Sequence, residues 1–248
     1  LRLGQLVDPV VDEQQAHVNY GVSHQSAIYH FAYEREEDVY LVLNSRNGAM
    51  KWDGKAVSGY QQLANQTRVY LYLVPESLPA EVQILTASGL ANGTEAEGRN
   101  AAVVLRFPAT TRELTVRYGI SFIESSQAMK NMEREVSGKS LAEIQKAGRD
   151  IWNEALGRID IDGGSENERT VFYTSLYRTY ERPVCISEDG RYFSAFDHEV
   201  HDDFGRPFYT DDWIWDSYRA HHPLRILVDA QRESDILNSF VRMSEQMD

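Results

Sequence analysis

Residues 208–223 read FYTDDWIWDSYRAHHP and bring together three aspartates, two tryptophans, two tyrosines, an arginine and two histidines. Carboxylates and a guanidinium group can hold the vicinal hydroxyls of a sugar through paired hydrogen bonds. A tryptophan can cover the apolar face of the sugar ring with its own flat face. The stretch is therefore typical of one wall of a carbohydrate-binding site.

The spacing within this stretch predicts which side chains share a face. In a helix over 211–222, Asp212, Asp216 and Arg219 fall together, because residues three and four apart are neighbours. Trp215 and Arg219 are also four apart, which allows the guanidinium to stack on the indole. The same pattern fits an intrahelical salt bridge beside two core tryptophans, and the spacing leaves both interpretations open.

The adjacent acids Asp211 and Asp212 have a structural explanation as well. In the first turn of a helix their negative charge favours the positive end of the helix dipole. A glycosidase needs two carboxyl groups on opposite sides of the scissile bond. Neighbours on one helix cannot flank a sugar in this way, so this pair is not interpreted as catalytic.

Two other polar clusters are weaker candidates. Residues 197–203, DHEVHDD, place His198 and His201 three apart, which differs from the zinc-protease pattern, and a solvated acidic loop is favoured over a metal site. The pair His221-His222 precedes Pro223, and proline disfavours the helical conformation of the residue before it. This pair therefore marks a helix end or kink first and a site only by context.

The first half of the chain has the alternation and composition of a β-protein, with runs rich in Val, Ile, Tyr and Phe. The predicted strands are His17–His24, Ala27–Glu34, Val39–Asn44, Arg68–Val74, Val82–Leu85, Ala101–Phe107 and Leu114–Phe122. Turns are predicted at Asn47-Gly48 and Asp53-Gly54, and a long loop over Ser88–Asn100. Consecutive strands without helices between them indicate a β-sandwich.

After Glu124 the pattern becomes helical. Capping boxes are predicted where Ser140 precedes Glu143 and where Ser165 precedes Glu168, because each pair can satisfy free amides at a helix start. A loop over 183–207 with a hairpin at Asp189-Gly190 follows. Two further helices are predicted over 211–228 and 231–247. The chain is thus all-β first and all-α second.

Bulk properties exclude some functions. The formal net charge of −13 argues against a nucleic-acid or anionic membrane surface, which needs a basic patch. The longest apolar runs are too short to span a bilayer. The last predicted helix reaches Asp248 without a capping glycine, a basic last turn or a proline, so the chain is expected to be a fragment of a longer parent protein.

Four motifs resemble those of family 92 of the glycoside hydrolases, the calcium-dependent exo-acting α-mannosidases. They are FYTSLYRTYERP (172–183), YFSAFDHEVH (192–201), YTDDWIWDSYRAHHPL (209–224) and DILNSFVRMSEQ (235–246). Their order and spacing are similar to the family pattern across roughly residues 114–248. The first hundred residues fit only as later strands of the family's sandwich domain.

The resemblance implies a β-sandwich domain, a helical linker and the start of an (α/α)6 barrel. Residues 1–124 would be part of the sandwich, 125–163 the linker, and 164–248 the first barrel helices. The remaining barrel segment of the parent protein would then be a partner of this chain, and the fragment alone is expected to be inactive.

The resemblance further implies removal of terminal α-linked mannose from glycans by an inverting, calcium-assisted mechanism, in a bacterial protein of the periplasm or the extracellular space. Trp215, Asp216 and Arg219 would line the subsite for the terminal mannose. The general acid, the general base and most calcium ligands would lie beyond Asp248. No catalytic residue or metal ligand is therefore assigned in this chain.

Two departures from the family pattern lie near the expected pocket. Asp211-Asp212-Trp213 replaces a less charged run, and residues 193–196 replace a glycine-rich loop. The linkage preference is therefore undetermined. Two alternatives stay open: a catalytically silent carbohydrate-binding protein of the same fold, and a structural β-sandwich module without a ligand.

Overall fold

A computed structural model describes residues 10–11, 16–34, 36–64, 66–86 and 89–247. The contacts divide the chain into two compact units, one ending at Gly148 and the other beginning at Arg149. This division falls within helix α2 (Leu141–Leu156). The three-part division at residues 124 and 163 stays a prediction, and each compact unit is described by itself below.

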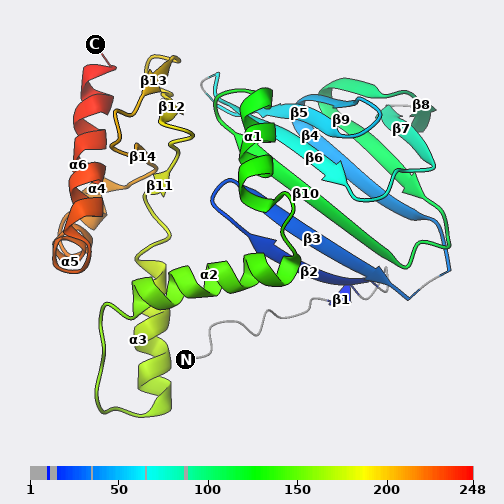
Figure 1. The fold of residues 1–248 in the computed structure, drawn as a ribbon. Coiled ribbons are helices and arrows are strands. Elements are labelled where there is room, and N and C mark those ends of the chain that lie inside the picture. The colour runs from blue at the N-terminus through cyan, green and yellow to red at the C-terminus, as the bar shows by residue number, and fades with distance from the viewer. Residues whose placement is uncertain (1–9, 12–15, 35, 65, 87–88, 248) are drawn as a thin grey trace. The chain divides into compact units, whose positions relative to one another are not determined.

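In the first unit the described strands form one antiparallel sheet in the order β1-β2-β3-β10-β6-β5-β4-β9-β7-β8 (Figure 1). The strands are β1 (Val10–Val11), β2 (Ala16–Val22), β3 (Ser26–Tyr33), β4 (Val39–Trp52), β5 (Val57–Gln62), β6 (Arg68–Pro75), β7 (Glu81–Thr86), β8 (Gly89–Asn92), β9 (Glu95–Phe107) and β10 (Glu113–Ser121).

The sheet closes over one of its own faces. Leu114 and Val116 of β10 share one buried cluster with Val103 and Leu105 of β9, although three strands separate β10 from β9 in the sheet order. Burial of this continuous apolar face is the main favourable term for the unit. The predicted β-sandwich is therefore confirmed.

Helix α1 (Ser125–Val136) covers the other face of β10 and β6. A second apolar cluster fills this contact, and its buried members are Ile28, Met132, Val136 and Ile144. The backbone of α1 approaches β10 closely at Gly119, where an added Cβ would collide with the carbonyl oxygen of Ala128. Glycine is therefore required at this crossing.

Two turn predictions in the sheet are wrong. Asn47-Gly48 lies inside β4, where Gly48 leaves room for the carbonyl oxygen of Tyr60 on the neighbouring strand. The expected loop over Ser88–Asn100 contains β8 and the start of β9. The Asp53-Gly54 turn is confirmed, because Asp53 Oδ1 accepts hydrogen bonds from the amides of Lys55 and Ala56.

The second unit holds the end of α2, then α3 (Glu166–Arg178), α4 (Ile214–Ser217), α5 (His221–Val228) and α6 (Ala230–Glu245). Short strands lie between α3 and α4, and they pair as β11 (Val184–Cys185) with β14 (Tyr209–Thr210) and β12 (Arg191–Phe193) with β13 (Val200–Asp202). None of the described helices is long and apolar enough to cross a membrane.

Both predicted capping boxes are present. Ser140 Oγ accepts from the amide of Glu143, and the Glu143 carboxylate accepts from the amide of Ser140. Ser165 and Glu168 make the same reciprocal pair at the start of α3. The hairpin at Asp189-Gly190 is also confirmed, with left-handed φ angles of 50° and 80° at its two central residues.

Replacing Gly119 by alanine is expected to destabilise the parent protein by about 1–3 kcal/mol, because the new methyl group displaces α1 from β10. The matched control is Gly148→Ala in α2, where the nearest atom to an added Cβ, the carbonyl oxygen of Val22, lies 4.0 Å away. Helix propensity favours alanine there by about 1 kcal/mol. Unfolding curves of both variants test this, and equal destabilisation would contradict it.

Candidate functional site

The predicted site residues follow directly after a short strand and a residue with a left-handed backbone conformation. Asp211 has a left-handed φ of 66° and follows β14, and α4 begins only at Ile214. A break over residues 218–220 separates α4 from α5, in which Pro223 occupies the first turn, where its missing N–H costs nothing. The predicted single helix over 211–228 is therefore wrong, and Pro223 marks a helix start.

The two tryptophan side chains of this segment are exposed. Trp213 is 52% exposed and Trp215 is 74% exposed, and their rings lie nearly parallel with centroids 6.3 Å apart. The Arg182 guanidinium lies over the Trp213 ring at 4.6 Å. The indoles are therefore not core residues, and the interpretation of Trp215 as a buried core tryptophan is wrong.

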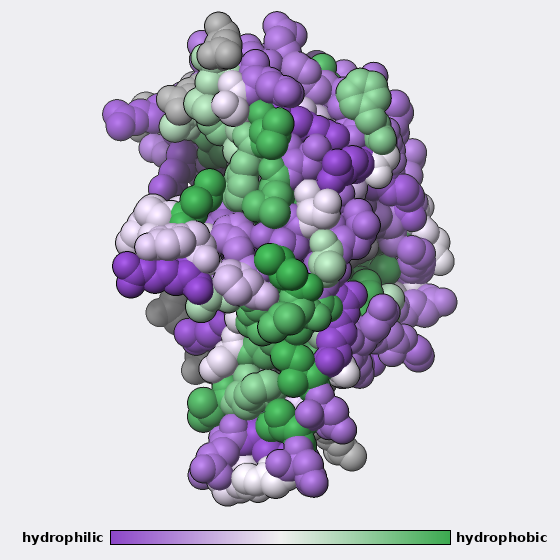
Figure 2. All heavy atoms as spheres, turned by 90° about the vertical axis from the view of Figure 1, so that its left-hand side faces the viewer, coloured by the Kyte–Doolittle hydropathy of each residue, from purple (hydrophilic) through white to green (hydrophobic). Residues whose placement is uncertain are grey.

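Figure 2 shows apolar side chains gathered over the helical unit. Large hydrophobic residues that remain exposed in α4, α5 and α6 are Ile214, Trp215, Ile226, Leu227, Leu237 and Val241. Contiguous exposed apolar surface of this kind marks a site of interaction. The described helices therefore expose several large apolar side chains, and Trp215 is one of them.

The three predicted binding residues are all exposed, but they do not form the predicted constellation. Asp216 has no hydrogen bond or ion pair to its carboxylate within the described part of the chain. Arg219 Nε donates to the Tyr218 hydroxyl at 2.8 Å and lies over the Tyr218 ring. The predicted stacking of Arg219 on Trp215 is therefore wrong.

Asp212, predicted to share their helix face, instead points into the protein. Arg225 Nη1 lies 3.3 Å from Asp212 Oδ2 and 3.6 Å from Glu233 Oε2, and both carboxylates are almost inaccessible. His222 Nδ1 lies 2.5 Å from Glu233 Oε1. Burying two carboxylates is costly, and the single guanidinium between them offsets that cost. We call Asp212, His222, Arg225 and Glu233 the buried ionic network.

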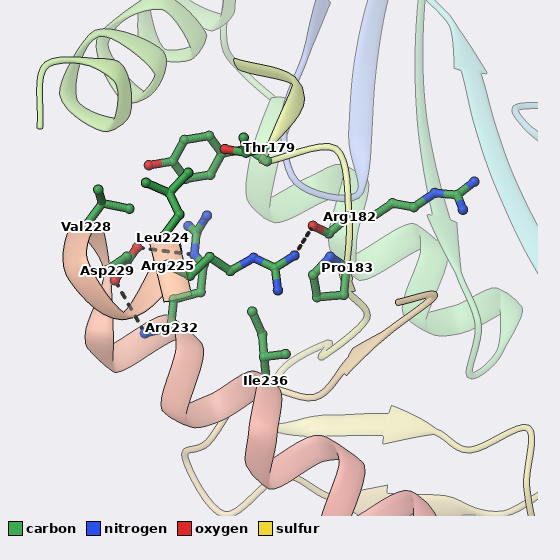
Figure 3. A pocket seen from close by; sticks show the side chains of 10 residues that line it. Thr179, Arg182, Pro183, Leu224, Arg225, Val228, Asp229, Arg232 and Ile236 are labelled. Carbon is green, nitrogen blue, oxygen red and sulfur yellow. Dashed lines mark hydrogen bonds and ion pairs between the residues drawn. The ribbon is translucent and has the colours of Figure 1, made fainter. Parts of the chain in front are cut away.

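Arg225 also fixes the chain before β11. Its Nη2 donates to the carbonyl oxygen of Arg182 at 2.7 Å, the contact drawn in Figure 3. Ser217 Oγ donates to the Trp213 carbonyl and lies 3.2 Å from His222 Nε2, which fastens α4 to α5. The network therefore positions both the segment that carries Arg182 and the short helix that carries Trp215 and Asp216.

A small cavity adjoins this network (Figure 3). Its lining includes Thr179, Arg182, Leu224, Arg225, Asp229 and Ile236. At about 20 Å³ it has room for one water molecule and not for a sugar. The exposed aromatic pair, and not this cavity, is the candidate binding surface.

Burial lowers the pKa of His221 below its ordinary value of 6.5, and the neighbouring Arg225 guanidinium lowers it further. His221 Nε2 lies 2.5 Å from the carbonyl oxygen of Thr179, and Arg225 Nη2 lies 3.1 Å from Nδ1. This arrangement suits a neutral imidazole that donates through Nε2 and accepts through Nδ1.

The acidic segment 197–203 is only partly the solvated loop that was expected. Asp197 pairs with His201 at 2.8 Å, residues 200–202 form β13, and Asp203 is buried. In the part of the chain that the structure describes, no three or more His, Cys, Asp or Glu side chains gather in a way that could hold a metal ion.

Sequence reasoning missed Arg182, Arg225 and Glu233. Arg182 reaches Trp213 from 31 positions away in the chain, so no local spacing connects them. Arg225 and Glu233 lie on different helices, and their charges would suggest exposure. In the sequence, Arg225 lies close to His221-His222, but this closeness alone does not predict a buried ion pair.

This chain is similar to known glycosidases. Residues 127–248 match the family model for the glycosyl hydrolase family 92 catalytic domain. A protein of Arthroderma benhamiae named as an uncharacterized secreted glycosidase is 29% identical over 111 residues, which cover 39% of this chain and 14% of that protein.

Two solved structures from Bacteroides thetaiotaomicron share the fold. One is a family GH92 inverting mannosidase, which is 24% identical and has a TM-score of 0.85. The match covers 94% of this chain and 33% of the mannosidase chain. The other is a family GH92 α-mannosidase, which is 21% identical and has a TM-score of 0.85. The match covers 93% of this chain and 34% of the α-mannosidase chain. This chain therefore spans about a third of the length of these structures.

The fold is thus that of a β-sandwich followed by the start of an (α/α)6 barrel. Residues 127–248 match the model of a glycosidase family, glycosyl hydrolase family 92, and the resemblance predicted from the sequence is confirmed.

Replacing Arg225 by methionine is expected to destabilise the parent protein by about 3–5 kcal/mol, because the buried carboxylates of Asp212 and Glu233 would lose the guanidinium that lies between them. The control Arg219→Met removes an exposed guanidinium and is expected to cost less than about 0.5 kcal/mol. Unfolding by denaturant measures both variants. A loss for Arg225→Met no larger than for the control would contradict the role of the network.

The lowered pKa of His221 predicts a pH dependence. Below pH 6.5 the unfolded chain binds a proton at His221 that the folded chain resists, so stability falls as the pH drops from 6.5 towards the folded pKa. Above pH 6.5 this contribution is constant. The variant His221→Gln keeps a donor and an acceptor, and its unfolding free energy should fall less over this window. An unchanged pH slope would contradict the assignment.

Proposed function

We propose that this chain is part of an exo-acting α-mannosidase that removes terminal α-linked mannose from glycans by an inverting, calcium-assisted mechanism. The observation that carries the proposal is the exposed indole of Trp215 beside the carboxylate of Asp216, which has no partner among the described residues, on a segment that matches a glycosidase family model. The two similar structures are named as mannosidases, which supports mannose as the sugar.

The chemistry of the exposed residues suits the terminal sugar. Trp215 offers a flat apolar face for the sugar ring, and Asp216 can accept hydrogen bonds from two hydroxyls. The Arg219 guanidinium can donate to a further hydroxyl after leaving Tyr218. A structure of a relative from Bacteroides thetaiotaomicron is described as a complex with mannoimidazole, which supports a mannose-shaped site in the fold.

The acid and base of the reaction are assigned to no residue of this chain. Inversion needs two carboxyl groups roughly 6.5–9.5 Å apart on opposite sides of the sugar, one protonated and one able to activate water. Asp212 and Glu233 are buried against Arg225 and cannot reach a substrate. The acid and base are therefore proposed to come from the remaining barrel segment of the parent protein.

The calcium ligands are likewise assigned to no residue of this chain. Calcium prefers six to eight oxygen ligands, and the described residues gather no carboxylate group of that kind. The residues described here do not fit a calcium site, so no step of the reaction is derived through the ion. We propose that its ligands, like the acid and base, belong to the rest of the parent protein.

The proposal includes a location outside the bacterial cytoplasm, in the periplasm or the extracellular space. Its support is the name of the Arthroderma benhamiae relative, a secreted glycosidase. The acidic net charge of −13 makes nucleic acid an unsuitable partner. A mannose-containing glycan and the remaining barrel segment are the proposed partners.

Asp216→Asn in the parent protein is expected to lower kcat/KM for mannose release by about 10- to 200-fold, because hydrogen bonds to a charged acceptor contribute about 1.5–3 kcal/mol. The control Asp160→Asn changes an exposed aspartate with no partner among the described residues, and its activity should match the wild type. Equal activity of both variants would remove Asp216 from the subsite.

The overall proposal is tested by mannose release from α-1,2-, α-1,3-, α-1,4- and α-1,6-linked mannobioses, with and without a calcium chelator. We expect the parent protein to release mannose from at least one linkage, to stop with chelator and to recover with added calcium. Binding without release would indicate a silent carbohydrate-binding protein. Neither binding nor release by folded protein would indicate a structural module.

A further inference from the structure

A second polar site lies on the β-sandwich unit, where β4 and β9 pair. Two neighbouring residues of each strand line a depression of about 820 Å³. They are Arg46 and Asn47 of β4 and Arg99 and Asn100 of β9. That volume lies within the range of sites for small molecules. The depression belongs to the first compact unit alone and shares no residue with the aromatic pair.

The backbone departs from regular β-structure at this point. Ser45 pairs with Ala101 and Asn47 pairs with Arg99, but no pair joins Arg46 and Asn100. Gly98 and Asn100 have left-handed φ angles of 102° and 58° on either side of Arg99. In a regular strand, neighbouring side chains point to opposite faces. The left-handed residues break this alternation and let all four side chains line one depression.

The two guanidinium groups are not neutralised by the protein. Within the described residues, neither Arg46 nor Arg99 has an ion pair, although acidic residues outnumber basic ones by 38 to 25. Glu97 lies two residues before Arg99, and among the described residues no ion pair joins them. By contrast, Arg106 on the same strand pairs with Asp38 and Glu81. Two positive charges therefore line one depression of an acidic protein without a counter-charge among the described residues.

The donor set defines the ligand chemistry. The depression has two forked guanidinium groups and two side-chain amides, and none of the described residues that line it is a carboxylate. A guanidinium binds carboxylate, sulfate or phosphate through two parallel hydrogen bonds, and amides complete the shell of an oxyanion. An anion that lies between two neighbouring cations lowers the repulsion between them.

We propose that Arg46, Arg99, Asn47 and Asn100 form a binding site for an oxyanion, either free or carried by a sugar. The net charge of −13 argues against a long polyanion as the ligand, because its many charges would be repelled. The site does not depend on the proposed mannosidase activity, since its residues lie on the sandwich and are assigned no part in mannose release.

Titration calorimetry of the parent protein at low ionic strength tests this, with inorganic phosphate, glucose 6-phosphate and glucose as probes. We expect saturable binding of both phosphates and none of glucose. The double variant Arg46→Gln/Arg99→Gln should weaken phosphate binding at least about tenfold. The control Arg149→Gln removes an exposed arginine of α2 that has no ion pair with any described residue, and it should leave binding unchanged.

Tighter binding of glucose 6-phosphate than of phosphate would identify a sugar-borne anion, and equal binding would identify a free one. No saturable binding of either phosphate would overturn the proposal, as would equal weakening in the control. Both arginines are exposed, so the melting temperature of the double variant should match the wild type. Mannose release serves as a separate readout and should be unchanged in the double variant.

Discussion

The helical unit depends on one guanidinium held between two buried carboxylates. Arg225 lies on α5, Asp212 precedes α4, and Glu233 lies on α6, so three parts of the chain meet at one charge. Two unit charges about 4 Å apart interact far more strongly in a protein interior than in water. The geometry of this network therefore decides how the segment between β14 and α5 is arranged.

In this arrangement the aspartates of the segment 211–216 have different surroundings: the side chain of Asp212 is buried, and Asp216 is exposed. Asp212 is drawn inward to Arg225, and the left-handed Asp211 allows the chain to turn at that point. Trp213, Trp215 and Asp216 are consequently directed to the surface. Burial of Asp212 thus goes together with exposure of Trp215 and Asp216, which could bind a sugar. One short segment therefore contributes both to a structural ion pair and to a candidate binding surface.

Much of the fold was predictable because its signals are local or periodic. Alternating strands, two capping boxes and the Asp189-Gly190 hairpin each follow from residues close together in sequence. The helix over 211–228 was predicted wrongly because its i, i+4 spacing is the same whether or not the helix forms. Asn47-Gly48 was misplaced because glycine serves both turns and close backbone contacts, and only the tertiary structure distinguishes them.

The same limit applies to the candidate site. The spacing identified Trp215, Asp216 and Arg219, but the partner of Arg219 is the adjacent Tyr218 and not Trp215. Arg182 was beyond any local pattern, although it covers one of the two indoles. Tertiary ion pairs and stacking across distant segments thus determine which of the polar residues in a motif remain available to a ligand.

The central claim is that Trp215 and Asp216 contact the terminal mannose while Asp212 remains bound to Arg225. A crystal structure of the parent protein with mannoimidazole tests it most directly. We predict the Trp215 ring against the apolar face of the inhibitor, the Asp216 carboxylate on its hydroxyls, and an unchanged Asp212–Arg225 pair. An inhibitor that contacts neither residue, or that draws Asp212 away from Arg225, would contradict this account.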